Sequence, residues 1–169
     1  MTANNITFTP ASEVTREQIG RHAETRFQDW MDANAINYLR VDQEPDTMAL
    51  AFKSKVRRPD YIIHVRAVGA TIAADVKSRK YDKGYQNFPV GDEDITRLQA
   101  FQQAFGLPVW LVLSTDAIDH EVWFWIALDQ VLAAIPPKHS SLSGKAFYPI
   151  RIDQCKVIGP LDGIEKIMG

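Results

Sequence analysis

The sequence has little of several features that define large classes of protein. It contains one cysteine, Cys155, among 169 residues, which excludes a disulfide framework and a cysteine-based zinc site within one chain. Its net charge is −2, so any nucleic-acid-binding surface must be local. No apolar run approaches the roughly twenty residues of a transmembrane helix, and nothing near the N-terminus has the pattern of a signal peptide. We therefore expect a cytoplasmic protein without a membrane partner.

Helical periodicity is clearest in two segments. The first runs from Thr15 to about Asn34, with Thr15 as the predicted N-cap. The second begins with Asp92 or Asp94 as its N-cap and ends near Gly106. A short helix over 128–135 and a terminal helix over 161–168 are also predicted. The polar residues 1–14 precede the first helix as an N-terminal arm, and residues 15–169 are expected to form a single domain.

Strand patterns lie between these helices. We expect strands over 36–42, 107–114, 121–127 and 147–152, and the near-continuous apolar run of 107–114 is typical of a strand that is buried on both faces. Residues 47–52 form either a short strand or a helical turn. The polar segments 78–91 and 136–144, which contain glycine and proline, are interpreted as loops.

The most informative stretch is 57–80, which has the pattern of a β-hairpin. With Val68-Gly69 as a two-residue loop, Asp60 lies opposite Lys77. Asp75 and Lys77 share one face of the second strand, because side chains alternate along a strand. Asp60, Asp75 and Lys77 therefore converge at the open end of the hairpin. Such a concentration of charge at the end of apolar strands is costly unless a cation or a substrate uses it.

These residues resemble the motif of the PD-(D/E)xK nuclease superfamily, which includes many restriction enzymes and archaeal Holliday-junction resolvases. The matching residues are Pro59-Asp60 and Asp75-Val76-Lys77. The resemblance covers about 20–114, and it leaves 115–169 as an addition for substrate choice or assembly. It implies an α/β protein with a restriction-endonuclease-like αβββαβ core, in which a mixed central sheet is flanked by helices.

The resemblance also implies two contributions from the helices. Glu24, on the first helix, borders the apolar stripe and is expected to reach the site, where it would hold a metal-bound water or a second cation. A solvated glutamate is the alternative. A polar residue of the second long helix is expected near the site as well, with Arg97, Gln99 and Gln102 as candidates.

The chemistry of the predicted site favours a hard divalent cation. Asp60 and Asp75 offer carboxylate oxygens, Val76 offers a backbone carbonyl, and Glu24 completes the metal-binding set, which suits Mg²⁺ or Mn²⁺. Lys77 is placed to orient a water or to stabilise charge on the phosphorus. The predicted catalytic residues are therefore Asp60, Asp75, Lys77 and Glu24.

Basic and aromatic side chains surround the predicted site in the sequence. Their functional interpretation is contact with nucleic acid, because cations bind phosphates and rings stack on bases. The alternative is an ordinary solvated surface. The predicted nucleic-acid-binding residues are Lys53, Lys55, Arg57, Arg58, Arg79, Lys80, Lys83, Tyr85 and Gln99.

The sequence thus predicts a Mg²⁺-dependent deoxyribonuclease that hydrolyses phosphodiester bonds in DNA, with RNA as an open alternative. A homodimer is compatible with this activity, because cutting both strands needs two sites. One alternative is an inactive nucleic-acid-binding or assembly module on the same fold, with Trp123 and Trp125 exposed at a protein interface. Another is that Asp60 and Lys77 form only a cross-strand ion pair.

Overall fold

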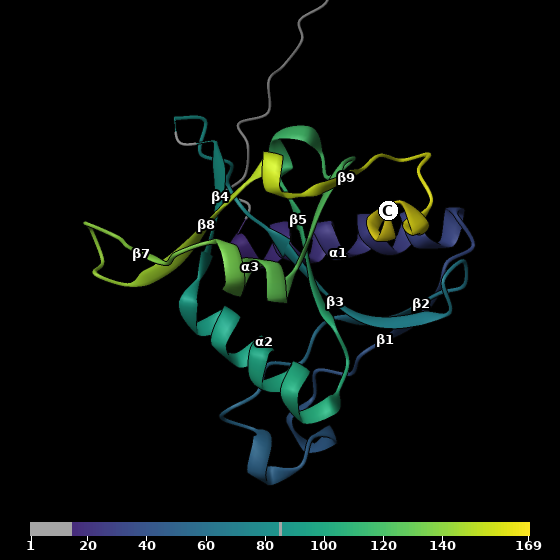
Figure 1. Cartoon of the computed structure of the whole chain (residues 1–169), viewed down its shortest axis with the longest axis horizontal. Coiled ribbons are helices and arrows are strands. Elements are labelled where there is room, and N and C mark those ends of the chain that lie inside the picture. Colours follow the sequence, from purple (N-terminus) through teal and green to yellow (C-terminus); the bar gives the residue numbers. More distant parts are fainter. Residues whose placement is uncertain (1–14, 85) are drawn as a thin grey trace, which may run out of the picture.

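A six-stranded mixed sheet forms the centre of the molecule (Figure 1). The computed structural model describes residues 15–84 and 86–169, so the predicted N-terminal arm lies outside the described residues. The strand order is β1 (Asn37–Arg40), β2 (Tyr61–Val65), β3 (Ala70–Ser78), β5 (Val109–Ser114), β6 (Trp123–Ala127) and β9 (Lys156–Ile158). Only β3 and β5 pair in parallel within this sheet, and the other neighbours are antiparallel.

Helix α1 (Arg16–Ala33) covers one face of this sheet. It begins as predicted, because Thr15 and Gln18 form a capping box in which each side chain accepts the other's backbone N–H. Its buried stripe includes Phe27, whose ring packs edge-on against Trp123 at a centroid distance of 5.0 Å. Trp123 and Trp125 are 1% and 0% exposed. The prediction that they form a protein interface is therefore wrong.

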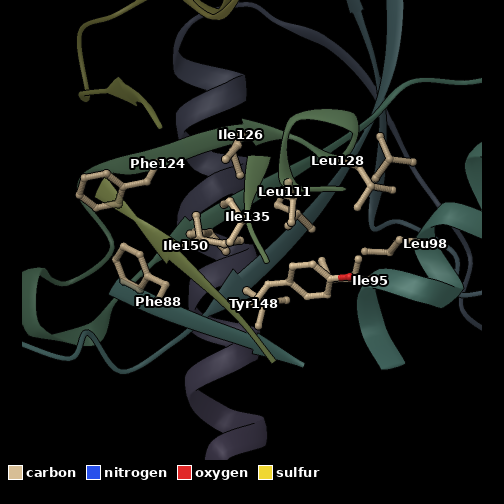
Figure 2. Close-up of a cluster of buried hydrophobic side chains, with 14 of the residues drawn as sticks. Phe88, Ile95, Leu98, Leu111, Phe124, Ile126, Leu128, Ile135, Tyr148 and Ile150 are labelled. Carbon is tan, nitrogen blue, oxygen red and sulfur yellow. The ribbon is translucent and has the colours of Figure 1, made fainter. Parts of the chain in front are cut away.

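The opposite face of the sheet carries a second core, which Figure 2 shows with α1 behind the strands. Helices α2 (Asp92–Phe105) and α3 (Leu128–Ala134) contribute to it. So does a small antiparallel sheet with the order β4 (Asn87–Gly91), β8 (Ala146–Arg151) and β7 (Lys138–His139). The labelled side chains Leu98, Leu111, Phe124 and Ile150 come from α2, β5, β6 and β8.

Strand β4 corrects the interpretation of 78–91 as a loop. Phe88 and Val90 alternate with exposed Pro89 and are buried in the second core. Proline is tolerated because β4 lies at the edge of the small sheet. The small sheet also takes in the predicted strand near 147–152, as β8, and two residues of the predicted loop 136–144, as β7.

Smaller differences concern element ends. Gly91 is the N-cap of α2, so neither Asp92 nor Asp94 caps it, whereas Gly106 ends the helix at φ +66° as expected. Residues 45–52 form two 3-10 turns (Pro45–Thr47 and Leu50–Phe52), which settles the alternative in favour of a helical turn. Another 3-10 turn (Asp116–Ile118) follows β5. Two further 3-10 segments lie near the C-terminus, Ile152–Gln154 and Ile164–Met168, and the second replaces the predicted terminal helix. No periodic pattern in the sequence predicts the three-residue strand β9.

The predicted fold class is confirmed as a mixed sheet with helices on both faces. The element order α1, β1, β2, β3, α2, β5 matches the expected αβββαβ core, with β4 added before α2. Within residues 15–84 and 86–169, no helix combines the length and the apolar character needed to cross a bilayer.

Candidate active site

The β2–β3 hairpin has a longer loop than the sequence suggested. Val65 pairs with Ala70, so the loop spans residues 66–69. The Val68 N–H donates to the Val65 carbonyl at 3.2 Å, and Gly69 closes the turn at φ +64°. The register differs by two residues from the prediction, so its continuation places Asp75, and not Lys77, beside Asp60. The predicted faces are retained, because an even shift leaves the alternation of side chains unchanged.

The two faces of β3 enter different cores. Ala74 and Val76 pack with α1, whereas Ala73 belongs to the core on the α2 side. Asp75 and Lys77 share the parity of Ala73 and therefore lie on the α2 side of the sheet. Both are buried, with exposed fractions of 0% and 3%.

Asp60 is held against β3 by its backbone and its side chain. Its N–H donates to the Ala74 carbonyl at 3.0 Å, and its own carbonyl accepts from the Val41 N–H at 2.9 Å. Its Oδ2 accepts the Val76 N–H at 2.7 Å. Backbone N–H and C=O of one strand residue point toward the same neighbouring strand, so the Val76 carbonyl also points to the Asp60 side. The structure thus brings the predicted ligands Asp60, Asp75 and Val76 to one end of the hairpin.

An ion-pair cluster of Arg57, Asp75, Lys77, Arg79 and Asp94 surrounds the α2 side of this end. Lys77 Nζ lies 2.7 Å from Asp75 Oδ2 and 3.1 Å from Asp94 Oδ2. Arg57 donates from Nε to Asp75 Oδ1 and from Nη1 to Asp94 Oδ1, at 3.2 Å in each case. Arg79 Nη2 donates to Asp94 Oδ2 at 3.3 Å. Lys77 is therefore paired with Asp75 and Asp94, and the alternative of an Asp60–Lys77 cross-strand pair is wrong.

Asp94 is the member of this cluster that sequence reasoning missed. It lies in the first turn of α2, and its position after Gly91 had suggested only a helix cap. Two of the three predicted candidates on α2 have structural partners: Gln102 accepts the Val109 N–H at 2.8 Å, and Arg97 donates to the Val56 carbonyl at 3.5 Å. A signal was present in the sequence, because three acidic residues in succession open the helix beside a basic segment.

The carboxyl groups at the hairpin end influence one another. Burial, followed by the charges of Asp75 and Glu24, raises the pKa of Asp60 to about 8, against the opposing effects of the Val76 N–H and Lys77. Burial also raises the pKa of Glu24, which the Arg40 guanidinium opposes and the Asp75 charge supports. Burial acts to raise the pKa of Asp94, but Lys77 and Arg57 outweigh it, and the net direction is downward.

The charge of Glu24 therefore affects Asp60, and the charge of Asp75 affects Glu24. The Glu24 carboxylate itself pairs with Arg40 of β1. Its Oε2 lies 3.4 Å from Arg40 Nη2, and its backbone carbonyl accepts the Tyr61 hydroxyl at 3.3 Å. Its side chain is about one-third exposed. Glu24 approaches Asp60 and Asp75 from the α1 side and is separate from the ion-pair cluster.

The donor chemistry of this end fits a hard divalent cation whose coordination shell is completed by other oxygens. Among the described residues, no three His, Cys, Asp or Glu side chains converge into a metal-binding group. Asp60 and Asp75 offer carboxylate oxygens beside the Val76 carbonyl. A cation bound there would lower the raised pKa of the Asp60 carboxyl group. Mg²⁺ commonly retains water and takes phosphate oxygens in such sites.

The predicted nucleic-acid-binding residues fall into three groups. Arg57 and Arg79 belong to the ion-pair cluster. Arg58 fastens the loop before the hairpin, donating to the Thr47 hydroxyl and to the Gln43 carbonyl at 2.5 and 2.6 Å. The remaining described residues are exposed or, for Gln99, half-buried, and they are Lys53, Lys55, Lys80, Lys83 and Gln99. Tyr85 lies outside the described residues.

An open groove of about 1210 Å³ leads away from the cluster. It runs between the start of α2 and the β7–β8 hairpin, which projects from the body of the molecule in Figure 1. Its lining carries charges of both signs: Arg16, Lys138 and Lys145 are basic, and Asp82, Asp92, Glu93 and Asp94 are acidic. Asp94 belongs both to the groove and to the cluster.

Comparison with known proteins identifies the fold. No protein-family model matches the sequence, and a search of curated proteins finds no similar sequence. The structure is similar to that of Hjc from Archaeoglobus fulgidus, described as a Holliday junction resolvase from an archaeal hyperthermophile. The TM-score is 0.50 at 15% sequence identity, over 76% of this chain and 86% of that chain. The restriction-endonuclease-like fold implied by the motif is therefore confirmed.

Proposed function

We propose that this chain is a divalent-metal-dependent deoxyribonuclease that hydrolyses phosphodiester bonds. The observation that carries the proposal is the burial of Asp75 and Lys77 side by side on β3, with the Asp60 carboxylate bonded to the same strand. Buried charges of this kind are expensive to maintain and are concentrated at functional sites. A similar fold occurs in Hjc, a Holliday junction resolvase.

Each residue of the site has a distinct role in this proposal. Asp60, Asp75 and the Val76 carbonyl, with Glu24 nearby, would hold Mg²⁺ or Mn²⁺. A cation bound there lowers the pKa of water and offsets the charge of the phosphate. Lys77 presents its ammonium group to the reacting phosphate and stabilises the negative charge that builds on it. Glu24, on the α1 side, would hold a metal-bound water or a second cation.

The proposed substrate is DNA, and the proposed preference is for branched DNA such as a four-way junction. The exposed lysines at 53, 55, 80 and 83 would contact phosphates on the two sides of the hairpin end. Symmetrical cutting of a junction requires two sites, so a homodimer is the proposed assembly.

Cleavage of a panel of labelled DNAs tests the proposal. Single-stranded, duplex, flap and four-way-junction substrates are incubated with Mg²⁺ or Mn²⁺ and with wild type, Asp75→Ala or Lys77→Ala. Lys166→Ala is the control, because it removes an exposed cation that pairs with Asp162 and belongs neither to the ion-pair cluster nor to the groove. We expect cation-dependent cleavage by wild type and the control, and loss of cleavage in both site variants. Site variants that cleave as well as wild type would reject the proposed residues. If no protein cleaves any of the DNAs, a nucleic-acid-binding module becomes the better hypothesis.

A further inference from the structure

The most unusual feature of the site is that three cations converge on a single carboxylate. Arg57 Nη1 reaches Asp94 Oδ1 at 3.2 Å, while Lys77 Nζ and Arg79 Nη2 reach Asp94 Oδ2 at 3.1 and 3.3 Å. These cations come from three separate positions in the chain: the segment before β2, the middle of the site on β3, and the residue after β3. A phosphate group is the ligand that such a set of donors would bind if Asp94 were absent.

Lys77 provides a second observation at the same place. Its side chain is 2% exposed, and its Nζ lies within ion-pair distance of the Asp75 and Asp94 carboxylates. Because an ammonium group has three N–H donors, Lys77 can accommodate an oxygen ligand in addition to these two carboxylates.

We infer that the Asp94 carboxylate occupies the position of a substrate phosphate and competes with it for Arg57, Lys77 and Arg79. Asp94 is accessible for such an exchange, because its side chain is 26% exposed and also lines the open groove. A phosphate that enters from the groove meets Asp94 first, displaces its carboxylate, and gains three donors that are already in place. This inference rests on the proposed function, because it assigns the phosphate-binding part of the same site.

The arrangement explains why a strongly positive site is tolerated before substrate arrives. Arg57, Lys77 and Arg79 together carry three positive charges, and Asp75 can neutralise only one of them. Asp94 reduces the imbalance while the site is empty of phosphate, and its removal leaves two donors, Arg79 and one branch of Arg57, without their partner. Asp94 is therefore an internal competitor that sets the affinity for phosphate, and not a group that touches the reacting atoms.

Asp94→Asn is the test variant, and Glu93→Gln is its matched control. Each substitution removes one negative charge from the first turn of α2 and changes the net charge from −2 to −1. Glu93 is exposed and pairs only weakly with Arg97 at 3.6 Å, outside the cluster. A non-specific effect of charge is therefore the same in both variants. Asp94→Ser, which keeps a polar residue that suits a helix start, replaces Asp94→Asn if the latter does not fold.

The measurement is binding in EDTA, where hydrolysis cannot occur. Fluorescence anisotropy follows a labelled four-way DNA junction, and calorimetry follows inorganic phosphate. We expect Asp94→Asn to bind both probes at least about fivefold more tightly than Glu93→Gln. The slope of log Kd against log salt for the junction should increase by about 0.9 for each additional phosphate that is contacted. Arg79→Gln should weaken binding more in the Asp94→Asn background than in wild type, since only there is Arg79 released.

The outcomes separate this inference from the proposed function. Equal affinities of Asp94→Asn and Glu93→Gln, or weaker binding by Asp94→Asn, would overturn the inference and leave the nuclease proposal intact. A gain in phosphate affinity by Asp94→Asn without junction binding by any variant would support the inference while rejecting the DNA substrate. A gain with both probes supports the inference and agrees with the proposed function.

Discussion

Asp60 makes the protein less stable as pH rises, because its pKa is raised in the folded state. An aspartate whose pKa is lowered on folding has the opposite effect. In the folded protein, burial and the charges of Asp75 and Glu24 raise the pKa of Asp60 from 3.8 to about 8. Between these two values the folded state holds a proton that the unfolded chain has lost. Folding stability contributed by this group is therefore complete below about pH 4, and it is lost as pH rises toward 8.

The size of the effect follows from the change in proton affinity. Each tenfold change is worth about 1.4 kcal/mol, so a rise from 3.8 to about 8 corresponds to at most roughly 6 kcal/mol. Asp75 and Glu24 respond to the same proton, and we expect about half of this limit. Asp60→Asn removes the titration but keeps an acceptor for the Val76 N–H. At pH 9 it should be more stable than wild type by roughly 3 kcal/mol, and the difference should vanish near pH 4.

Urea unfolding followed by tryptophan fluorescence measures this difference, because Trp30, Trp123 and Trp125 are buried. Curves are recorded from pH 4 to pH 9 for wild type, Asp60→Asn and the control Asp46→Asn, which changes an exposed carboxylate in a 3-10 turn. Mg²⁺ should stabilise wild type at pH 8.5 and should have less effect on Asp60→Asn. Parallel stability curves for wild type and Asp60→Asn would refute the electrostatic description of the site.

Three further predictions concern other parts of the structure. Lys77→Met should abolish cleavage in the DNA assay and lower the free energy of unfolding by roughly 3 kcal/mol, because it leaves Asp75 buried without one of its two cations; unchanged stability in urea would contradict the buried pairing. Trp123→Ala should cost roughly 3 to 5 kcal/mol in the same unfolding measurement, since the ring is 1% exposed and packs on α1; a loss below about 1 kcal/mol would show that the indole is not in the core. Gly106→Ala should lower stability by roughly 1 kcal/mol through strain at φ +66°, and calorimetric melting that shows no decrease would argue against this helix end.

Much of the fold could be predicted because its signals are local. The capping box at Thr15 and the helical spacing of Phe27 and Trp30 specify α1 without reference to the rest of the chain. Alternation along β3 placed Asp75 and Lys77 on one face, and this conclusion survived the error in the loop because side-chain direction depends only on parity. Asp60, Asp75 and Lys77 therefore lie at the same end of the hairpin, and their role as a metal-dependent site stays a prediction.

The parts that could not be predicted depend on partners that are distant in the sequence. Strand β4 is short and contains Pro89, and it exists because β8 pairs with it about sixty residues later. Strand β9 has only three residues and gains its partner from β6. Asp94 was interpreted as a helix cap, because nothing in the local pattern reveals that Arg57 and Arg79 point toward it.

The position of the divalent cation is the claim on which the proposed chemistry depends most. It can be located by replacing Mg²⁺ with Fe²⁺ in the presence of ascorbate and peroxide, since hydroxyl radicals formed at the bound iron cut the polypeptide nearby. We predict cuts close to Asp60 and in the segment Asp75–Lys77, which excess Mg²⁺ suppresses and which Asp60→Asn and Asp75→Asn both lose. Cuts at other positions, or cuts near the hairpin end that persist in both variants, would contradict a cation held by these two carboxylates.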